Sequence, residues 1–353
     1  MRHGWTGAAL VTTAVVAAAA PAHGQGHWYR GNTHVHTLNS DGNAAPGDVA
    51  RWYRDHGYAF VFITDHELIT DVAPLNASFG APGRFLVLRG EEITQQVDDP
   101  SRPDVRRQAH VGSLGPVSAV LPLGEGGITR GVTVAQTYAR NLAEIRAAGG
   151  LPQVNHPNFR WSVGPGDMAG LPDSTLFEVW NSQPHINNLG GDDGAGHVSL
   201  STEALWDTLL TRGKLLYGVA SDDAHKFRPD QLEDFEATRP GGGWVMVRAD
   251  TLTPAAIVGA LRAGDFYATN GVLLERYEAG SREIVVQVAA PDGPRDDRRY
   301  VTRFIGRSGR VLAEVAGRDA RYSIRGDEGY VRATVTDSNG RRAWTQPVRV
   351  RAR

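Results

Sequence analysis

Seven short apolar runs, separated by loops and amphipathic segments, place the tightest limit on how residues 28–220 can fold. Several of these runs are apolar throughout, which is typical of strands buried on both faces of a parallel sheet. Regular alternation of strands with helices predicts right-handed crossovers and a parallel sheet, either open or closed into a barrel. The predicted strands are Trp28–Val35, Ala59–Ile63, Phe85–Leu88, Val111–Leu114, Leu151–Val154, Leu176–Val179 and Leu215–Ala220.

Four amphipathic segments carry the start and stop signals of helices. Pro46 suits the first turn of one helix, and Gly57 follows its last residue. Thr133 and Gln136 have the spacing of a capping box at the start of another. The four predicted helices run from about Pro46 to His56, from Thr133 to Gly149, from Thr202 to Arg212 and from Thr253 to Gly264.

The sequence changes character near Glu278–Ser281, because apolar and polar residues alternate from there onward and turn signals separate the runs. This pattern predicts a small antiparallel β-sandwich. We therefore expect an α/β domain over residues 23–278 and a β-sandwich domain over residues 279–353. The predicted strands of the second domain are Ile284–Val288, Tyr300–Phe304, Val311–Val315, Tyr322–Ile324, Tyr330–Thr336 and Trp344–Val350.

Residues 1–22 have the pattern of an export signal. Arg2 supplies a positive end, Gly7–Ala20 is an apolar run, and Ala20-Pro21-Ala22 fits a cleavage site between small residues. An uncleaved anchor is the alternative, although a membrane span needs roughly 20 apolar residues. We expect the mature protein in the periplasm or outside the cell. The chain has no cysteine, which excludes disulfides and thiolate metal ligands.

The charge of the chain argues against a nucleic-acid partner. Formal net charge is −2, and no basic stripe runs along the sequence. The sequence predicts no oligomeric state.

Residues that can bind metal follow most of the predicted strands. In a parallel barrel the carboxyl ends of the strands gather on one face, so these side chains are expected to meet there. His34 and His36 lie two apart, which places both imidazoles on the same side of a strand. His110 fits less well, because it precedes its apolar run. The candidate ligands are His34, His36, Asp41, His66, Glu91, His110, His156, Asp223 and His225.

Two of these choices are made between adjacent acids. Only one of Glu91 and Glu92 can point inward from a strand, and Glu91 is favoured as the bridging carboxylate. The Asp-x-His spacing favours Asp223 over Asp222, which is expected to support it from outside the ligand set. Asp65 precedes His66 and could either orient a ligand or cap a turn.

Imidazoles and carboxylates together suit zinc, manganese or iron. Nine ligands are too many for one ion, so the sequence predicts a cluster of two or three divalent metals and hence a hydrolase. Asp223 or His225 could accept a proton during catalysis. Lys226, Arg160 and Arg89 are candidates for binding an anionic substrate.

The motifs together resemble the PHP (polymerase and histidinol phosphatase) superfamily over about residues 28–230. Later segments, Leu261–Thr269 and Ala343–Pro347, are similar to its CehA/McbA-type branch. The motifs that carry the resemblance are Thr33–Gly42, Ile63-Thr64-Asp65-His66, Gly90-Glu91-Glu92, Asn155-His156-Pro157 and Ser221-Asp222-Asp223-Ala224-His225. The resemblance implies a distorted (β/α)7 barrel with a two- or three-metal centre, followed by a β-rich tail.

The resemblance also implies how the ligands divide among the ions. His34, His36, Glu91 and Asp223 would hold the first, Asp41, His66 and His225 the second, and His110, His156 and the bridging Glu91 the third. Asp41 stands where some members carry His, and a carboxylate there favours manganese or iron over zinc.

The activity implied by the resemblance is that of an exported metal-dependent hydrolase. Phosphoester cleavage by a metal-activated bridging hydroxide is the first expectation. Cleavage of carbamates or carboxylic esters is the alternative that the branch resemblance implies. A third hypothesis is a binding protein whose barrel has lost catalysis and whose β-sandwich docks a polysaccharide or another protein.

Overall fold

The computed structural model describes residue 1 and residues 26–103, 105–192, 198–228, 239–290 and 297–350. The predicted signal segment, residues 1–22, therefore lies outside the described residues except for Met1. Within the described ranges, no helix has both the length and the apolar character that crossing a membrane requires.

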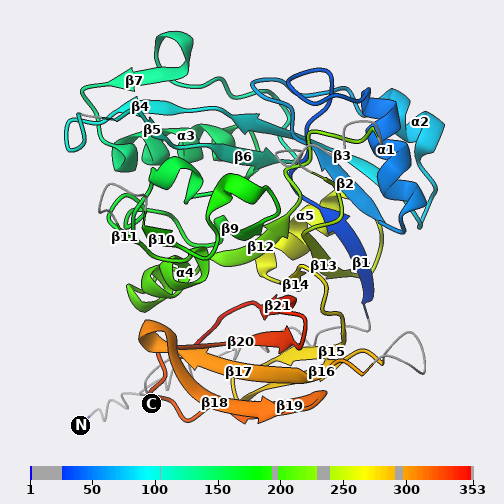
Figure 1. The fold of residues 1–353 in the computed structure, drawn as a ribbon, viewed down its shortest axis with the longest axis vertical. Coiled ribbons are helices and arrows are strands. Elements are labelled where there is room, and N and C mark those ends of the chain that lie inside the picture. The colour runs from blue at the N-terminus through cyan, green and yellow to red at the C-terminus, as the bar shows by residue number, and fades with distance from the viewer. Residues whose placement is uncertain (2–25, 104, 193–197, 229–238, 291–296, 351–353) are drawn as a thin grey trace.

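One large mixed sheet runs through the molecule and is flanked by a few helices (Figure 1). In spatial order its strands are β12 (Tyr217–Ser221), β9 (Leu176–Asn181), β8 (Leu151–Val154), β6 (Val111–Leu114), β3 (Leu86–Ile93), β2 (Phe60–Ile63), β1 (His27–Asn32), β13 (Trp244–Ala249), β14 (Phe266–Thr269), β21 (Arg342–Thr345), β20 (Tyr330–Asp337), β17 (Tyr300–Gly306) and β18 (Arg310–Ala316), with β22 (Val348–Arg349) beside β20.

All seven strands predicted for the first part are present, but they are not all parallel. β1, β2 and β3 are mutually parallel, as are β8, β9 and β12. β6 runs antiparallel to both β3 and β8, and β1 runs antiparallel to β13. A crossover helix is missing between β3 and β6, so the chain returns in the opposite direction. The regular alternation expected of a (β/α)7 barrel is therefore broken at β6.

The segment between β3 and β6 instead begins a second, smaller sheet. Its strands are β4 (Gln96–Asp98), β5 (Arg107–Gln108) and β7 (Ile128–Arg130), none of which the sequence patterns predicted. A further short pair, β10 (Gly191–Asp192) and β11 (Val198–Ser199), precedes the fourth helix.

The four predicted helices form, and a fifth short one joins them. α1 (Pro46–Asp55), α3 (Val134–Ala147), α4 (Thr202–Thr211) and α5 (Pro254–Ala263) match the predicted ranges to within a few residues, and α2 (Ala73–Phe79) was not predicted. The capping box at the start of α3 is present, because Thr133 and Gln136 exchange their hydrogen bonds.

The large sheet curves around an apolar interior. Phe62 of β2, Leu88 of β3 and Val219 of β12 share one cluster with Ile257 and Leu261 of α5. Helix α1 covers the outer face of β2 and β3, and α3 and α4 cover the outer face of the strands beyond.

The segments that follow β1 and β12 pair with each other. The backbone N–H of His36 donates to the Ala224 carbonyl at 3.0 Å, and that of Asp223 donates to the His34 carbonyl at 2.9 Å. A parallel bridge joins Val35 to Ala224. Two segments that are far apart in sequence, and that both carry candidate metal ligands, are therefore held side by side.

The C-terminal strands, called the tail (residues 274–350), form two layers. β15 (Leu274–Ala279), β16 (Glu283–Val288) and β19 (Asp319–Ser323) make a three-stranded sheet that shares an apolar cluster with β17 and β20. The other layer continues the large sheet, because β21 pairs with β14. The strands of the predicted sandwich are thus present, but one of its two layers is continuous with the large sheet. The domain limits at residues 278 and 279 stay a prediction.

Candidate metal centre

The strands that line the interior place apolar side chains at the end near α5 and polar side chains at the opposite end. Successive side chains on a strand alternate between its two faces. On β3 the inner positions are Leu88 and, four residues later, Glu92; Val219 faces the interior from β12, and Asp223 follows the end of that strand. The interior is therefore apolar near α5 and becomes a polar pocket at the carboxyl ends of the parallel strands.

The first group of potential ligands is fully buried and consists of His34, His36, Glu92 and Asp223. The Nε2 atoms of His34 and His36 are 3.1 Å apart. Each lies 3.2 Å from Asp223 Oδ1, and they lie 3.2 and 3.3 Å from Glu92 Oε2. Ligands at about 2.0–2.1 Å from a tetrahedral zinc ion are roughly 3.3 Å from one another. The spacing of these four atoms is that of a coordination shell.

The second group lies beside the first and is open to solvent on one side. It consists of His36, Asp41, His66 and His225. The carboxylate of Asp41 lies 3.3 Å from His225 Nε2 and 3.5 Å from both His66 Nε2 and His36 Nδ1. The side chain of Asp41 is 57 % exposed, so solvent can reach this group.

The third group consists of Glu92, His110 and His156. Glu92 Oε1 lies 3.1 Å from His156 Nε2 and 3.5 Å from His110 Nδ1. The antiparallel direction of β6 explains why His110 precedes its strand. The amino end of β6 lies at the same edge as the carboxyl ends of β3 and β8.

The prediction of Glu91 as the bridging carboxylate was wrong, and Glu92 occupies that place. Glu91 is on the outer face of β3, where its carboxylate accepts the backbone N–H of Val120 at 3.0 Å. Burial raises the pKa of Glu91 to about 7. Leu88 lies in the inner cluster, and the period of two along β3 then selects Glu92. The sequence held this signal.

Glu92 and His36 each belong to two of the three groups, so the groups form one continuous cluster. The two oxygens of Glu92 face different histidines, which is the geometry of a bridging carboxylate. Asp223 Oδ1 and His110 Nδ1 are buried with no hydrogen-bond donor or acceptor paired to them. Divalent cations would satisfy both atoms, and the hard and borderline donors present suit zinc, manganese or iron.

Electrostatics favour positive charge at most imidazoles of the cluster, whereas burial lowers the pKa of His110. Burial by itself lowers the pKa of His34, but the charges of Asp223, Glu92 and Glu178 together raise it well above its usual value. The same balance between burial and nearby carboxylates raises the pKa of His156 and His225. The acids of this pocket thus attract cations, whether protons on the rings or metal ions between them.

Glu178, which the sequence analysis did not select, holds several ligands in place. Its fully buried carboxylate lies 2.8 Å from His34 Nδ1 and accepts the backbone N–H of His156 at 2.6 Å and the Ser221 hydroxyl at 2.6 Å. A carboxylate on the outer nitrogen of a ligating imidazole fixes the tautomer and orientation of the ring. A single acid within the apolar run Leu176–Val179 was the signal for it.

Asp65 and Asp222 support loops and do not contact the ligands through their carboxylates in any hydrogen bond described. Asp65 accepts the hydroxyls of Thr37, Ser40 and Thr70, so it organises the loop that carries Asp41. Asp222 accepts the Tyr53 hydroxyl at 2.7 Å. Burial raises the pKa of Asp222 to about 6.

A cavity of about 470 Å³ opens over the cluster. Arg160 and Lys226, two of the three candidate substrate-binding residues, line it together with Phe159 and His185. The third, Arg89, was a wrong choice. It is exposed on the outer face of β3, where it donates to the Val117 carbonyl at 3.4 Å.

Unusual backbone conformations gather around this cavity. His156, Arg160 and Asp223 adopt positive φ values of 25°, 51° and 50°. Such conformations are costly for residues other than glycine and are found preferentially at functional sites.

Comparison with known proteins adds little to this geometry. No family model and no curated protein matches the chain. The chain is similar to a solved two-domain protein from Bacteroides vulgatus that contains a predicted PHP-like metal-dependent phosphoesterase. The alignment covers 94 % of this chain and 90 % of that protein, with 14 % sequence identity and a TM-score of 0.45. An amidohydrolase from Chromobacterium violaceum matches 59 % of this chain and 90 % of its own, with 16 % identity and a TM-score of 0.35. Both TM-scores lie below one half, so a function for this chain has to rest on the geometry of its own site.

Proposed function

We propose that this protein is an exported metal-dependent hydrolase with a polynuclear centre, built on a barrel of PHP type. The observation that carries the proposal is the sharing of Glu92 and His36 between adjacent ligand groups, because shared ligands bring ions within bridging distance. Group one (His34, His36, Glu92, Asp223), group two (His36, Asp41, His66, His225) and group three (Glu92, His110, His156) would each hold an ion. Bound divalent ions would act as Lewis acids and make water reactive near neutral pH.

The side chains of this chain supply the remaining functions. Glu178 orients His34 and the turn that carries His156, so part of the ligand set is held before substrate arrives. Asp223 and His225 reach the cavity and are placed to accept a proton. Arg160 and Lys226 lie on the cavity wall, where a cation would bind an anionic substrate.

Phosphoester cleavage is the first candidate reaction, since two cationic residues and a metal cluster together suit a phosphoryl group. Carbamate or carboxylic ester cleavage is the second, and Phe159 and Ile186 favour it by giving part of the cavity wall an apolar surface. A binding protein without catalysis is the remaining hypothesis.

A metal-dependent assay on three substrate types tests the proposal. Purified protein would be assayed on p-nitrophenyl phosphate, its bis-ester and an aryl carbamate after addition of zinc, manganese or iron. Activity on the carbamate alone would refute the phosphoesterase proposal, and a protein that binds these metals without turnover would favour the binding protein. Absence of bound metal would refute the proposal as a whole.

The adjacent acids on β3 give a matched pair of variants. Glu92→Gln removes the shared carboxylate and should lower turnover on the order of 100-fold or more, because a direct ligand matters at least as much as the groups behind it. Glu91→Gln keeps an acceptor for the Val120 N–H on the opposite face and should stay within about threefold of wild type. Equal losses in both variants would contradict the assignment of Glu92.

A further inference from the structure

The strand that precedes Asp223, β12, lies at one end of the large sheet. β12 pairs with β9 on one side, so the N–H and C=O groups on its other side need partners from elsewhere. At Gly218 both groups are satisfied by one side chain of the tail. The Gly218 N–H donates to Gln346 Oε1 at 2.8 Å, and Gln346 Nε2 donates to the Gly218 carbonyl at 2.8 Å.

This pair of hydrogen bonds imitates a neighbouring strand. A carboxamide offers the same donor and acceptor as a peptide group, and Gln346 presents both to one residue of β12. Gln346 is 3 % exposed, and its backbone N–H is held by the Tyr277 hydroxyl at 3.2 Å. The tail therefore holds the backbone of Gln346 in the position from which its side chain contacts β12.

The contact lies directly before an irregularity in the strand. The register of β12 against β9 shifts between Val219 and Ala220, which is the mark of a β-bulge. Bulges redirect a strand and are frequent beside active sites. On the other side of Gly218, a Cβ atom would come within 2.8 Å of the Trp206 ring, so the strand is closely packed there as well. Gln346 thus secures Gly218, one residue before the last regular pair, Val219 with Glu178, after which β12 leads to Asp223 and His225.

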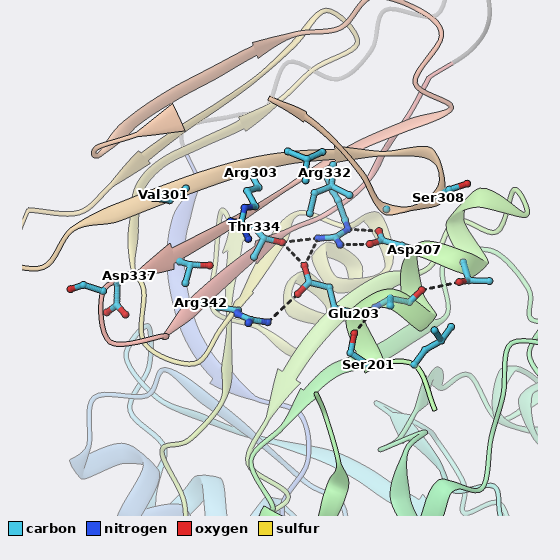
Figure 2. A pocket seen from close by; sticks show the side chains of 18 of the residues that line it. Ser201, Glu203, Asp207, Val301, Arg303, Ser308, Arg332, Thr334, Asp337 and Arg342 are labelled. Atoms are coloured by element: carbon cyan, nitrogen blue, oxygen red, sulfur yellow. Dashed lines mark hydrogen bonds and ion pairs between the residues drawn. The ribbon is translucent and has the colours of Figure 1, made fainter. Parts of the chain in front are cut away.

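A second contact links the tail to the segment after β12 that carries Asp222 and Asp223. The rings of Trp344 and Trp180 stack with centroids 6.1 Å apart, and Trp180 donates to the Gly242 carbonyl at 3.1 Å. The Gly242 N–H donates to Asp222, the residue before Asp223. Elsewhere the tail docks on α4 through Arg332, which Figure 2 shows between Glu203 and Asp207.

We propose that Gln346 is a positioning residue for the metal centre, and that the tail therefore completes the site rather than serving as a separate binding module. The inference rests on the proposed function. A slip of β12 by one residue would displace the segment that follows it and so misplace Asp223 and His225 relative to the other ligands. Loss of Gln346 should therefore disturb the first two ligand groups, which contain Asp223 and His225, and spare the third, Glu92 with His110 and His156.

The test compares metal binding by variants of the full chain. Gln346→Met keeps the length of the side chain and removes both hydrogen bonds to Gly218. Manganese and zinc would each be titrated into metal-free protein by calorimetry, after circular dichroism has shown that the variant is folded. We expect at least one ion to bind on the order of tenfold more weakly, as for other residues that support ligands. The cobalt-substituted variant should also show an altered visible spectrum.

Two controls separate positioning from loosened docking. Arg349→Ala removes another contact between the tail and the first part of the chain, the 2.8 Å bond to the Gly213 carbonyl. Gln287→Ala removes a glutamine from β16 in the tail's other layer. Both should bind metal within about twofold of wild type, a difference of less than half a kcal/mol in binding free energy.

The outcomes distinguish this inference from the proposed function. A Gln346→Met protein that binds every ion as the controls do would overturn the inference while leaving the proposed function intact. A uniform loss at all sites would overturn it too, since that result indicates general destabilisation. If Gln346→Met does not fold, Gln346→Asn decides, because it keeps a carboxamide at this buried position, shortens its reach to Gly218 by one methylene and should show the same selective loss. A wild-type protein that binds no metal would refute the proposed function.

Discussion

Two buried clusters of charged residues differ in how their charges balance. In the tail network, Arg332 and Arg342 face Glu203 and Asp207, so two cations meet two anions (Figure 2). Arg332 is fully buried and donates to both oxygens of Asp207, at 2.7 and 2.6 Å. The network is neutral and its hydrogen bonds are made within the chain.

In the metal centre, by contrast, the ion-pair partners described for Asp41, Glu92 and Asp223 are all imidazoles. An imidazole with its ordinary pKa of about 6.5 is largely neutral at pH 7, so the chain can offset these carboxylates only by holding protons on the rings. Two of the buried polar atoms there, Asp223 Oδ1 and His110 Nδ1, have no hydrogen-bond partner. The comparison teaches that burial of charge alone does not indicate a ligand site. The useful signal is a cluster of carboxylates whose charge the chain offsets only with rings that can lose their protons, and not with Arg or Lys.

Breaking the tail network should produce the largest change in stability. Arg332→Met leaves Asp207 buried without its guanidinium, which should lower the free energy of unfolding by about 3–5 kcal/mol. The matched control is Arg303→Met, on the neighbouring strand, whose ion pair with Glu314 is exposed and should be worth about 0–1 kcal/mol. Urea unfolding measures both. Similar losses in the two variants would contradict the view that the buried network stabilises the tail's docking.

Adding metal should raise the free energy of unfolding only through the metal centre. A divalent ion that binds the folded state at 100 times its dissociation constant raises the free energy of unfolding by about 2.7 kcal/mol. We expect this gain in wild type and a smaller one in Glu92→Gln, which keeps only the second ligand group intact, measured as the shift in thermal midpoint on adding zinc or manganese. Arg303→Met should gain as much as wild type. An equal gain in wild type and Glu92→Gln would place the bound metal outside the two groups that share Glu92.

Much of this arrangement could be predicted from residues close together in sequence. His34 and His36 share a face through their spacing, and the end of a strand predicts the place of His66, His156 and Asp223. The structure brings all of these together with Asp41, His110 and His225. Glu178, which supports them, was missed because an acid inside an apolar run was not interpreted as an inner-face residue.

The rest depended on contacts that sequence patterns do not encode. The direction of β6 follows from the path of the chain through β4 and β5, and neither strand was predicted. Gln346 and Gly218 are 128 residues apart, so no local pattern pairs them. The choice between Glu91 and Glu92 lies between these cases. It required only the phase of β3, which Leu88 sets once it is known to face the interior.

The smallest expected effect is a difference in pH dependence between the two clusters. In the metal-free protein, the raised pKa values of His34, His156 and His225 add stability that is fully present below about pH 6.5 and is lost as pH rises through the folded-state values. Glu91 and Asp222 act in the same direction, because burial raises the pKa of these acids to about 7 and about 6, so that their ionisation on raising the pH is disfavoured in the folded state.

We therefore expect the free energy of unfolding of metal-free protein to fall by on the order of 1 kcal/mol between about pH 6 and about pH 8. Saturating zinc or manganese should reverse the slope, since metal competes with protons for the ring nitrogens and binds more tightly as pH rises. The difference in unfolding free energy between Arg332→Met and wild type should stay constant over this range, because guanidinium does not titrate there. Urea unfolding at several pH values checks all three. A metal-free protein that gains stability toward pH 8 would show that the histidines of the centre are not held by its acids.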